Sequence, residues 1–176
     1  LEFRRVLFRS RLANVPAEEV IAIVCSRPEV RTLTGPRHPK DLIGMAHSPA
    51  YFAAAAVADR RFGWEHATQE KLMDPVIRRL LDVVEVGEPP TENLDRYKQG
   101  ATVTVKVRDG RSFTATVYAP RGSAINGIDW ADVDAKFRTL APYAGFNAER
   151  IEQCMATIRR FGELDRKSTR LNSSHT

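Results

Sequence analysis

The chain has 176 residues, of which 43% are hydrophobic and 28% are charged, so it can bury the core of one domain. No apolar run approaches the roughly 20 residues that cross a membrane, and we therefore expect no membrane partner. Cys25 and Cys154 are far apart and lack the spacing of zinc or iron–sulfur ligands, which argues against a metal site. Both thiols are predicted to be reduced core residues, which favours a cytoplasmic protein.

Both ends of the chain look foreign to the rest. Residues 1–10 and 165–176 match translated short-read sequencing adapters, except for the final Thr176, and such segments are excluded from fold reasoning. Without them, 21 of the 27 Lys/Arg residues and 20 of the 22 Asp/Glu residues remain. The net charge of +5 is thus mostly a property of the ends, so we expect no nucleic-acid partner. Residues 11–164 are predicted to be a fragment of a natural protein.

The first predicted element is a mostly buried strand. Residues Glu19–Cys25 are apolar and β-branched, and Pro16 and Pro28 bound them. The glycine and proline residues at 35–39 then force an irregular loop.

A buried helix is predicted to begin after this loop. Ser48 is a good N-cap, Pro49 suits the first helical position, and the apolar run Phe52–Ala58 follows. A buried helix start has free N–H groups and the positive end of the helix dipole, so it favours an anion such as a carboxylate. His47 and Tyr51 flank this helix start and make a chemical site plausible there.

A second helix and a possible strand are predicted next. Thr68 can cap a short turn, and Asp74–Pro75 opens a helix that continues through Asp82. This helix runs directly into the possible strand Val83–Val86.

The clearest local pattern is a β-hairpin. Valines alternate with polar residues over 102–108, and the return strand at 113–117 alternates in the same way. Asp109–Gly110 between them is a hairpin turn signal. One polar face on each strand predicts a small antiparallel sheet with one side facing water.

Two more helices are predicted after the hairpin. Asp129 caps the first, which carries Trp130 and Leu140, and Ala148–Phe161 forms the second with one apolar stripe. The order of strand, two helices, short antiparallel sheet and two helices predicts an α+β fold.

Five runs of the sequence occur in a familiar order. They are HPKDLIGMAHSPAYFAAAAVADRRF, DPVIRRLLDVVEV, VTVKVRDGRSFTATV, a Pro-x-Gly loop and DVDAKFRTL. Together they resemble the C-terminal part of the MmgE/PrpD family, which includes 2-methylcitrate dehydratase and cis-aconitate decarboxylase. The resemblance implies that residues 11–125 form the small lid domain of a two-domain, otherwise helical lyase. Residues 126–164 would be helices that return to the helical domain.

The resemblance also implies an activity. Family members are lyases that use no metal or organic cofactor, are typically homodimers, and remove a proton beside a carboxylate of a small polycarboxylate. The family's His-Ser-x-x-Tyr pattern falls on His47, Ser48 and Tyr51. Tyr51 is the first catalytic candidate, as a hydrogen-bond donor or proton-transfer group, and His47 is the second, as a carboxylate ligand or acid/base. Ser48, Lys40 and Arg121 are the candidate substrate-binding residues.

Structural alternatives stand beside these roles. His47 could bond to a backbone carbonyl, and Tyr51 could be a core residue whose hydroxyl reaches a polar neighbour. Lys40 and Arg37, just before the helix, could attract a polycarboxylate or be solvated loop charges, and Ser48 could simply cap its helix. His38 and His66 are predicted to be structural or solvent-facing.

Two function classes remain open. The first is a hydro-lyase, with a cis-aconitate-type decarboxylase as the variant within that class. The second is a non-catalytic α+β module for dimerisation or small-acid binding. A family His and Lys are expected upstream of Arg11, so the isolated chain is predicted to be inactive.

Overall fold

The computed structural model describes residues 15–163, and the adapter-like ends predicted at 1–10 and 165–176 lie outside the described residues. The chain divides into two compact units, Leu1–Gly127 and Ile128–Thr176.

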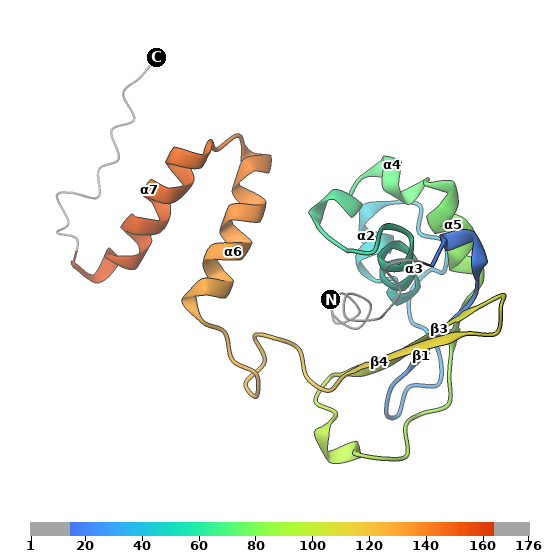
Figure 1. Cartoon of the computed structure of the whole chain (residues 1–176). Helices are drawn as coiled ribbons and strands as arrows, with labels where there is room; N and C mark the ends of the chain where they lie inside the picture. The colour runs from blue at the N-terminus through green and yellow to red at the C-terminus, as the bar shows by residue number, and fades with distance from the viewer. Residues whose placement is uncertain (1–14, 164–176) are drawn as a thin grey trace. The chain divides into compact units, whose positions relative to one another are not determined.

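A four-stranded sheet forms one layer of the first unit (Figure 1). Its order is β2-β1-β3-β4, with β1 at Val20–Ser26, β2 at Val84–Val86, β3 at Ala101–Val107 and β4 at Ser112–Val117. The predicted α+β class is confirmed, but the sheet is mixed, because β2 pairs parallel to β1 while β3 pairs antiparallel to it. Parallel neighbours need a long crossover connection. The helices between β1 and β2 supply it.

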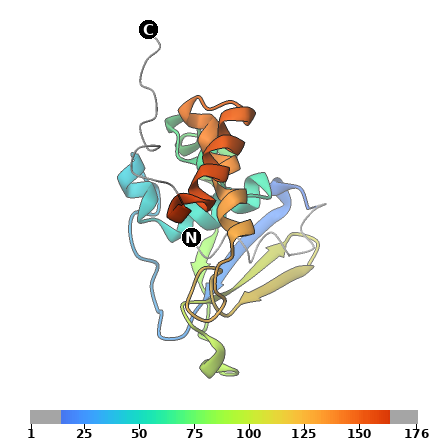
Figure 2. The same ribbon diagram turned by 90° about the vertical axis from the view of Figure 1, so that its left-hand side faces the viewer.

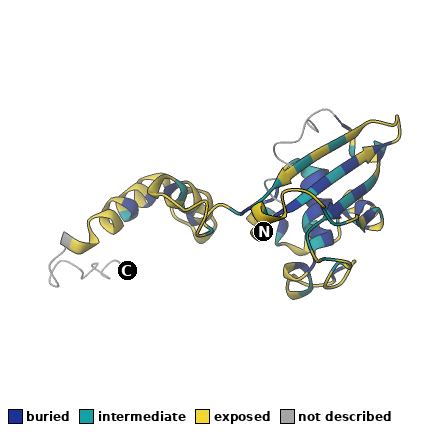
Figure 3. Ribbon diagram, turned by 90° about the horizontal axis from the view of Figure 1, so that it is seen from below, coloured by how far each residue is buried: buried dark blue, intermediate teal, exposed yellow. Residues whose placement is uncertain are grey.

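The predicted hairpin is confirmed as β3 and β4. Val103, Val105 and Val107 are buried, while the side chains between them lie on the wetter face. Figure 3 shows this alternation of buried and more exposed residues across the sheet. On that outer face Thr102 bonds to Thr116 with 2.7 Å between the hydroxyl oxygens, and a second cross-strand threonine pair lies beside it. The polar face is therefore held by its own hydrogen bonds.

Four short helices cover the other face of the sheet, as Figures 1 and 2 show. They are α2 (Leu42–Ala46), α3 (Pro49–Asp59), α4 (Gln69–Leu72) and α5 (Pro75–Asp82). The predicted caps Ser48, Thr68 and Asp74 each accept backbone N–H bonds at these helix starts. α2 was not predicted, and Asp41 caps it by accepting a hydrogen bond from Gly44 N–H at 2.7 Å.

The core of the first unit lies between α3, α5 and the sheet. α3 is apolar nearly all round, which suits a helix enclosed by other elements, and it packs against α5 and β2. Short 3₁₀ turns complete the unit, namely η2 (Ala17–Glu19), η3 (Trp64–His66) and η4 (Leu94–Arg96). The fully enclosed aliphatic residues are Ile23, Val57, Ile77, Leu80, Leu81 and Val105.

The second unit is a pair of helices. It contains α6 (Trp130–Leu140), η5 (Ala141–Ala144), α7 (Ala148–Arg159) and η6 (Phe161–Glu163). Asp129 and Asn147 cap the two long helices. Only part of the predicted stripe on the last helix is enclosed, because Ile158 and Phe161 are 48% and 67% exposed. The buried residues here are Asp134, Ala141, Ile151 and Met155.

Both cysteines are free thiols. Cys25 is buried, and burial raises its pKa to about 12, so it stays protonated and unreactive at neutral pH. Cys154 is half-buried on α7. Within residues 15–163 no group of three His, Cys, Asp or Glu side chains is placed to hold a metal ion. In the same range no helix is long and apolar enough to cross a membrane.

Candidate functional site

The predicted site lies where α2 ends and α3 begins. Ser48 is fully buried, and its hydroxyl accepts a hydrogen bond from Tyr51 N–H at 3.1 Å. Its own N–H donates to the Met45 carbonyl at 3.1 Å. Ser48 therefore acts as the N-cap that the sequence predicts, with its polar atoms already occupied.

The helix start offers fewer free donors than a generic helix N-terminus. Pro49 has no N–H, Ser48 satisfies Tyr51, and Phe52 N–H donates to the Ser48 carbonyl at 3.2 Å. The Ala50 N–H is the first-turn donor that finds no partner in the described part of the chain. The predicted anion-binding mouth is thus reduced to one N–H and the helix dipole.

His47 is the exposed polar residue of this helix start. It is the last residue of the α2 turn, and its N–H bonds to the Ile43 and Gly44 carbonyls at 3.3 Å. Its imidazole is exposed and makes no hydrogen bond or ion pair to any described residue. Within residues 15–163 the ring therefore lacks the backbone-carbonyl partner that the structural alternative expects.

A glycine fixes the backbone at His47. A Cβ added to Gly35 would lie 1.9 Å from the His47 carbonyl oxygen, and Gly35 has a φ of +72°. Only glycine suits both conditions. The loop before α2 therefore lies directly against the helix start.

Tyr51 is buried rather than open to solvent. Its hydroxyl donates to the His66 carbonyl at 2.9 Å, and its ring meets Phe62 edge-on. Burial, with smaller contributions from the Asp59 and Asp74 charges, raises the pKa of Tyr51 above its usual value. Tyr51 is therefore a neutral hydrogen-bond donor, and its geometry matches the core alternative.

A small pocket of about 240 Å³ adjoins the first turn of α3. Arg37 lines it, and the Arg37 guanidinium donates 2.7 Å bonds to the carbonyls of Leu81 in the last turn of α5 and of Val84 at the start of β2. Arg37 is therefore bound to the fold and is not a solvated loop charge. The lining residues are Thr32, Leu33, Thr34, Gly35, Arg37, Ala50 and Val86.

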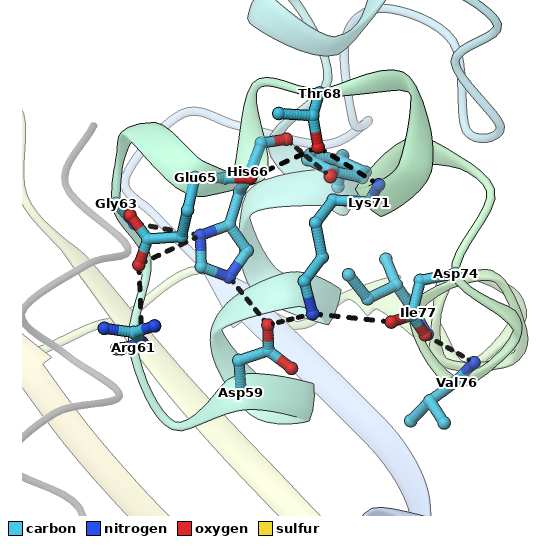
Figure 4. Close-up of polar contacts among 11 residues, drawn as sticks. Asp59, Arg61, Gly63, Glu65, His66, Thr68, Lys71, Asp74, Val76 and Ile77 are labelled. Carbon is cyan, nitrogen blue, oxygen red and sulfur yellow. Dashed lines mark hydrogen bonds and ion pairs between the residues drawn. The ribbon is translucent and has the colours of Figure 1, made fainter. Parts of the chain in front are cut away.

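A half-buried polar network lies at the other end of α3 (Figure 4). Asp59 is its centre: its carboxylate lies 3.1 Å from His66 Nε2 and 2.5 Å from Lys71 Nζ. Lys71 also reaches the Asp74 carboxylate at 3.4 Å. The hydrogen bond that Lys71 donates to Asp59 raises the pKa of Lys71, so the ammonium stays charged between the two acids.

The hydrogen bonds to the His66 ring determine its tautomer. The Gly63 N–H donates to Nδ1 at 3.0 Å, so Nε2 carries the ring proton and donates it to Asp59. The ring is fully buried and stacks on Phe62, with 4.8 Å between centroids. His66 is structural, as predicted, and its carbonyl holds the Tyr51 hydroxyl.

Lys40 and Arg121 lie in different parts of the first unit. Lys40 is exposed, and its carbonyl accepts a 3.5 Å bond from the Gln69 side chain. Arg121 is exposed and follows β4, the edge strand furthest from β2, whereas α3 packs next to β2. The structure brings His47, Ser48 and Tyr51 together, and leaves Arg121 apart from them.

Comparison with known families decides what kind of protein carries this site. Residues 7–160 match the MmgE/PrpD C-terminal domain. The chain belongs to the MmgE/PrpD family. This family comprises 2-methylcitrate dehydratases and related lyases. No curated protein matched the chain.

The MmgE/PrpD match includes every candidate site residue, and it also includes the polar network that sequence reasoning missed. Asp59, His66 and Lys71 have no helical spacing in common, because they come from three different elements. The Lys71–Asp74 pair, three residues apart beside a predicted cap, was the one local signal for this network.

Proposed function

We propose that this chain contributes the lid-domain part of a hydro-lyase of the 2-methylcitrate dehydratase type, which acts on a small polycarboxylate. The MmgE/PrpD match over residues 7–160 carries this proposal. The exposed His47 beside the capped start of α3 supports it, since an imidazole there can meet a carboxylate or move a proton.

The proposed reaction needs an acid and a base at neutral pH. A base takes the proton on the carbon beside a carboxylate, the released electron pair forms the carbon–carbon double bond, and the hydroxyl leaves with a proton as water. Negative charge develops on the carboxylate side during this step, and a positioned donor stabilises it. We assign His47 as the group of this chain that meets the substrate carboxylate or transfers a proton.

Tyr51 receives a different assignment. Its role as a proton-transfer group stays a prediction, but its hydroxyl already donates to the His66 carbonyl at 2.9 Å in a buried setting. This geometry favours a Tyr51 that positions α3, with His47 at the surface of that helix start. The Ser48 hydroxyl already caps α3, the role of Lys40 stays a prediction, and Arg121 is the weakest member of the predicted set.

The first experiment recovers the upstream reading frame and assays the longer protein for 2-methylcitrate dehydration. We expect a helical segment with a His and a Lys before Arg11, and activity in the longer protein only. The 176-residue chain should be inactive, because His47 is the one predicted catalytic residue that it exposes. Appreciable dehydration by the isolated chain, or a start codon close to Arg11, would contradict the proposal.

The second experiment tests His47 in the longer protein. We expect His47→Gln to lower kcat/KM by about 10²-fold, the usual loss for a positioned acid or base, without lowering Tm, because the ring has no described partner. His38→Gln is the matched control, since His38 pairs with Asp82 at 2.8 Å and should leave kcat/KM unchanged. Equal rates for His47→Gln and the unmodified protein would remove His47 from the mechanism.

A further inference from the structure

A second groove lies at the end of the sheet where β1 stops and β3 starts. The segment 27–31 that leaves β1 forms one wall, and the connector 89–100 that leads into β3 forms the other. The groove has a volume of about 490 Å³, which falls within the usual range for small-molecule sites. It also lies beyond the carboxyl ends of the parallel pair β1 and β2, where α/β sheets commonly bind ligands.

Two arginines on this groove have no partner among residues 15–163. The described part of the chain offers neither a hydrogen bond nor an ion pair to the guanidinium of Arg27 or Arg31. Most other described arginines have one: Arg37 binds backbone carbonyls, and Arg138 forms a two-bond pair with Glu152. The groove therefore presents two free guanidinium forks, which suit phosphate or carboxylate oxygens.

The rest of the groove is largely apolar and aromatic. Pro28, Pro89, Pro90, Leu94 and Tyr97 line it. Two contacts hold the Tyr97 ring: its hydroxyl lies 2.7 Å from Thr102 Oγ1, and the ring forms an edge contact with Tyr118 at 5.0 Å between centroids. An inorganic anion would leave these apolar side chains exposed to water, whereas the apolar part of an organic ligand would cover them.

The walls are held in unusual backbone conformations. Glu29 and Gln99 line the groove with φ values of +62° and +65°, and Asn93 beside it has a φ of +54°. Non-glycine residues seldom adopt such values. Gly100 fixes the connector further, since an added Cβ would lie 2.0 Å from the Val117 carbonyl oxygen. Such outliers gather at binding sites, where the fold holds groups in place before a ligand arrives.

We propose that this groove binds a small organic anion, with a phosphate or carboxylate head on Arg27 and Arg31 and a flat apolar body against Tyr97 and the prolines. Glu29 is the acidic residue of the lining, so the groove carries net positive charge. The proposal does not depend on lyase activity, and it concerns residues other than those at the start of α3.

The test uses the 176-residue chain and two probes, AMP and 2-naphthoate. We expect at least one to bind and to shift the amide signals of Tyr97 and Gly100 in NMR titrations. Adenosine and inorganic phosphate should each bind about tenfold more weakly than AMP, because each lacks one half of the ligand. AMP binding would indicate a phosphate head and 2-naphthoate binding a carboxylate head, and either result supports the proposal.

Matched variants distinguish specific binding in this groove from non-specific attraction of an anion to the positively charged protein. The double variant Arg27→Gln/Arg31→Gln should weaken binding at least tenfold, as expected for lost bidentate contacts. The control Arg78→Gln/Arg150→Gln removes the same charge from two arginine side chains that also lack described partners, and it should change binding less than about twofold. The single variant Arg31→Gln repeats the test at an exposed position if the double variant fails to fold. Equal weakening by both double variants, or no binding of either probe at millimolar concentration, would overturn the proposal.

Discussion

Tyr51 joins two parts of the first unit through one buried hydrogen bond. Its backbone N–H belongs to the cap of α3, while its hydroxyl reaches the His66 carbonyl in η3. A buried donor that loses its acceptor, or the reverse, costs more than the bond itself contributes. Tyr51 therefore links the start of α3 to the polar network at the far end of the same helix.

This bond makes a stability prediction for Tyr51→Phe. The variant should lower the free energy of unfolding by about 1–2 kcal/mol, because the His66 carbonyl stays buried without its donor. Urea unfolding of the 176-residue chain measures the change. Tyr143→Phe is the control: Tyr143 is 59% exposed, so its loss should be within about 0.5 kcal/mol. An unchanged midpoint for Tyr51→Phe, with a large fall in turnover of the longer enzyme, would instead favour the catalytic role.

The sequence predicted which residues form the start of α3, but it did not predict how deeply Tyr51 is buried or what surrounds it. Ser48 and Pro49 are local signals, because a cap and a first-turn proline act on their own helix. The burial of Tyr51 depends on its contact with η3, and no residue near Tyr51 in the sequence predicts that contact. The network of Asp59, His66 and Lys71 was missed for the same reason.

At the scale of elements, the capped helices and the hairpin were predictable, and the pairing of the sheet was not. Asp74 and Pro75 begin α5, and Asp109–Gly110 turns β3 into β4, as predicted. The parallel pairing of β1 with β2 joins Ile23 to Val84, which are too far apart in the chain for any local pattern to report it. α2 is five residues long and includes Gly44, so its periodicity was too short to recognise.

The start of α5 gives a prediction about pH. Burial opposes ionisation of Asp74, but bonds from the Ile77 and Val76 N–H groups and the nearby Lys71 outweigh it, so the pKa of Asp74 lies below its usual value. A carboxyl with a lowered folded-state pKa stabilises the protein above its unfolded pKa of about 4, and this contribution is lost as pH falls through the folded value.

Two variants separate the cap of α5 from the charge of Asp74. Asp74→Asn keeps an acceptor for the cap but loses the ion pair, so at pH 7 it should cost up to about 1 kcal/mol. Asp74→Ala loses both and should cost about 1 kcal/mol more. Urea unfolding between pH 7 and pH 2 should show the difference between the unmodified chain and Asp74→Asn shrinking below about pH 4. A constant difference over that range would refute the charge argument.

At the scale of the whole molecule, the two units differ in how much core they enclose. The first unit buries residues from four helices and three strands, and partly buried β4 residues pack against them. The second encloses Ala141, Ile151 and Met155, with Phe137 packed against them. Its exposed apolar residues are Ile128, Trp130, Val133, Leu140, Tyr143, Phe146, Ile158 and Phe161. So small a core does not offset the conformational entropy of a helix pair.

This difference predicts how the units behave when separated. A segment of residues 15–127 should unfold cooperatively in urea with a midpoint close to that of the full chain. A segment of residues 128–163 should show weak helical circular dichroism at 25 °C, because short isolated helices are marginal in water. Strong, concentration-independent helicity in that segment would show that its small core is sufficient.

The central place of β1 has a consequence for how the chain folds. Its partners arrive late, since Val84 and Val105 pair with Ile23 about 60 and about 80 residues further along the chain, and such distant contacts slow folding. On the ribosome, β1 is the first of the four strands to be made, and both its edges stay open while the helices that follow it emerge. A nascent or truncated chain that ends before Val107 therefore exposes an unpaired apolar strand, which is a template for aggregation.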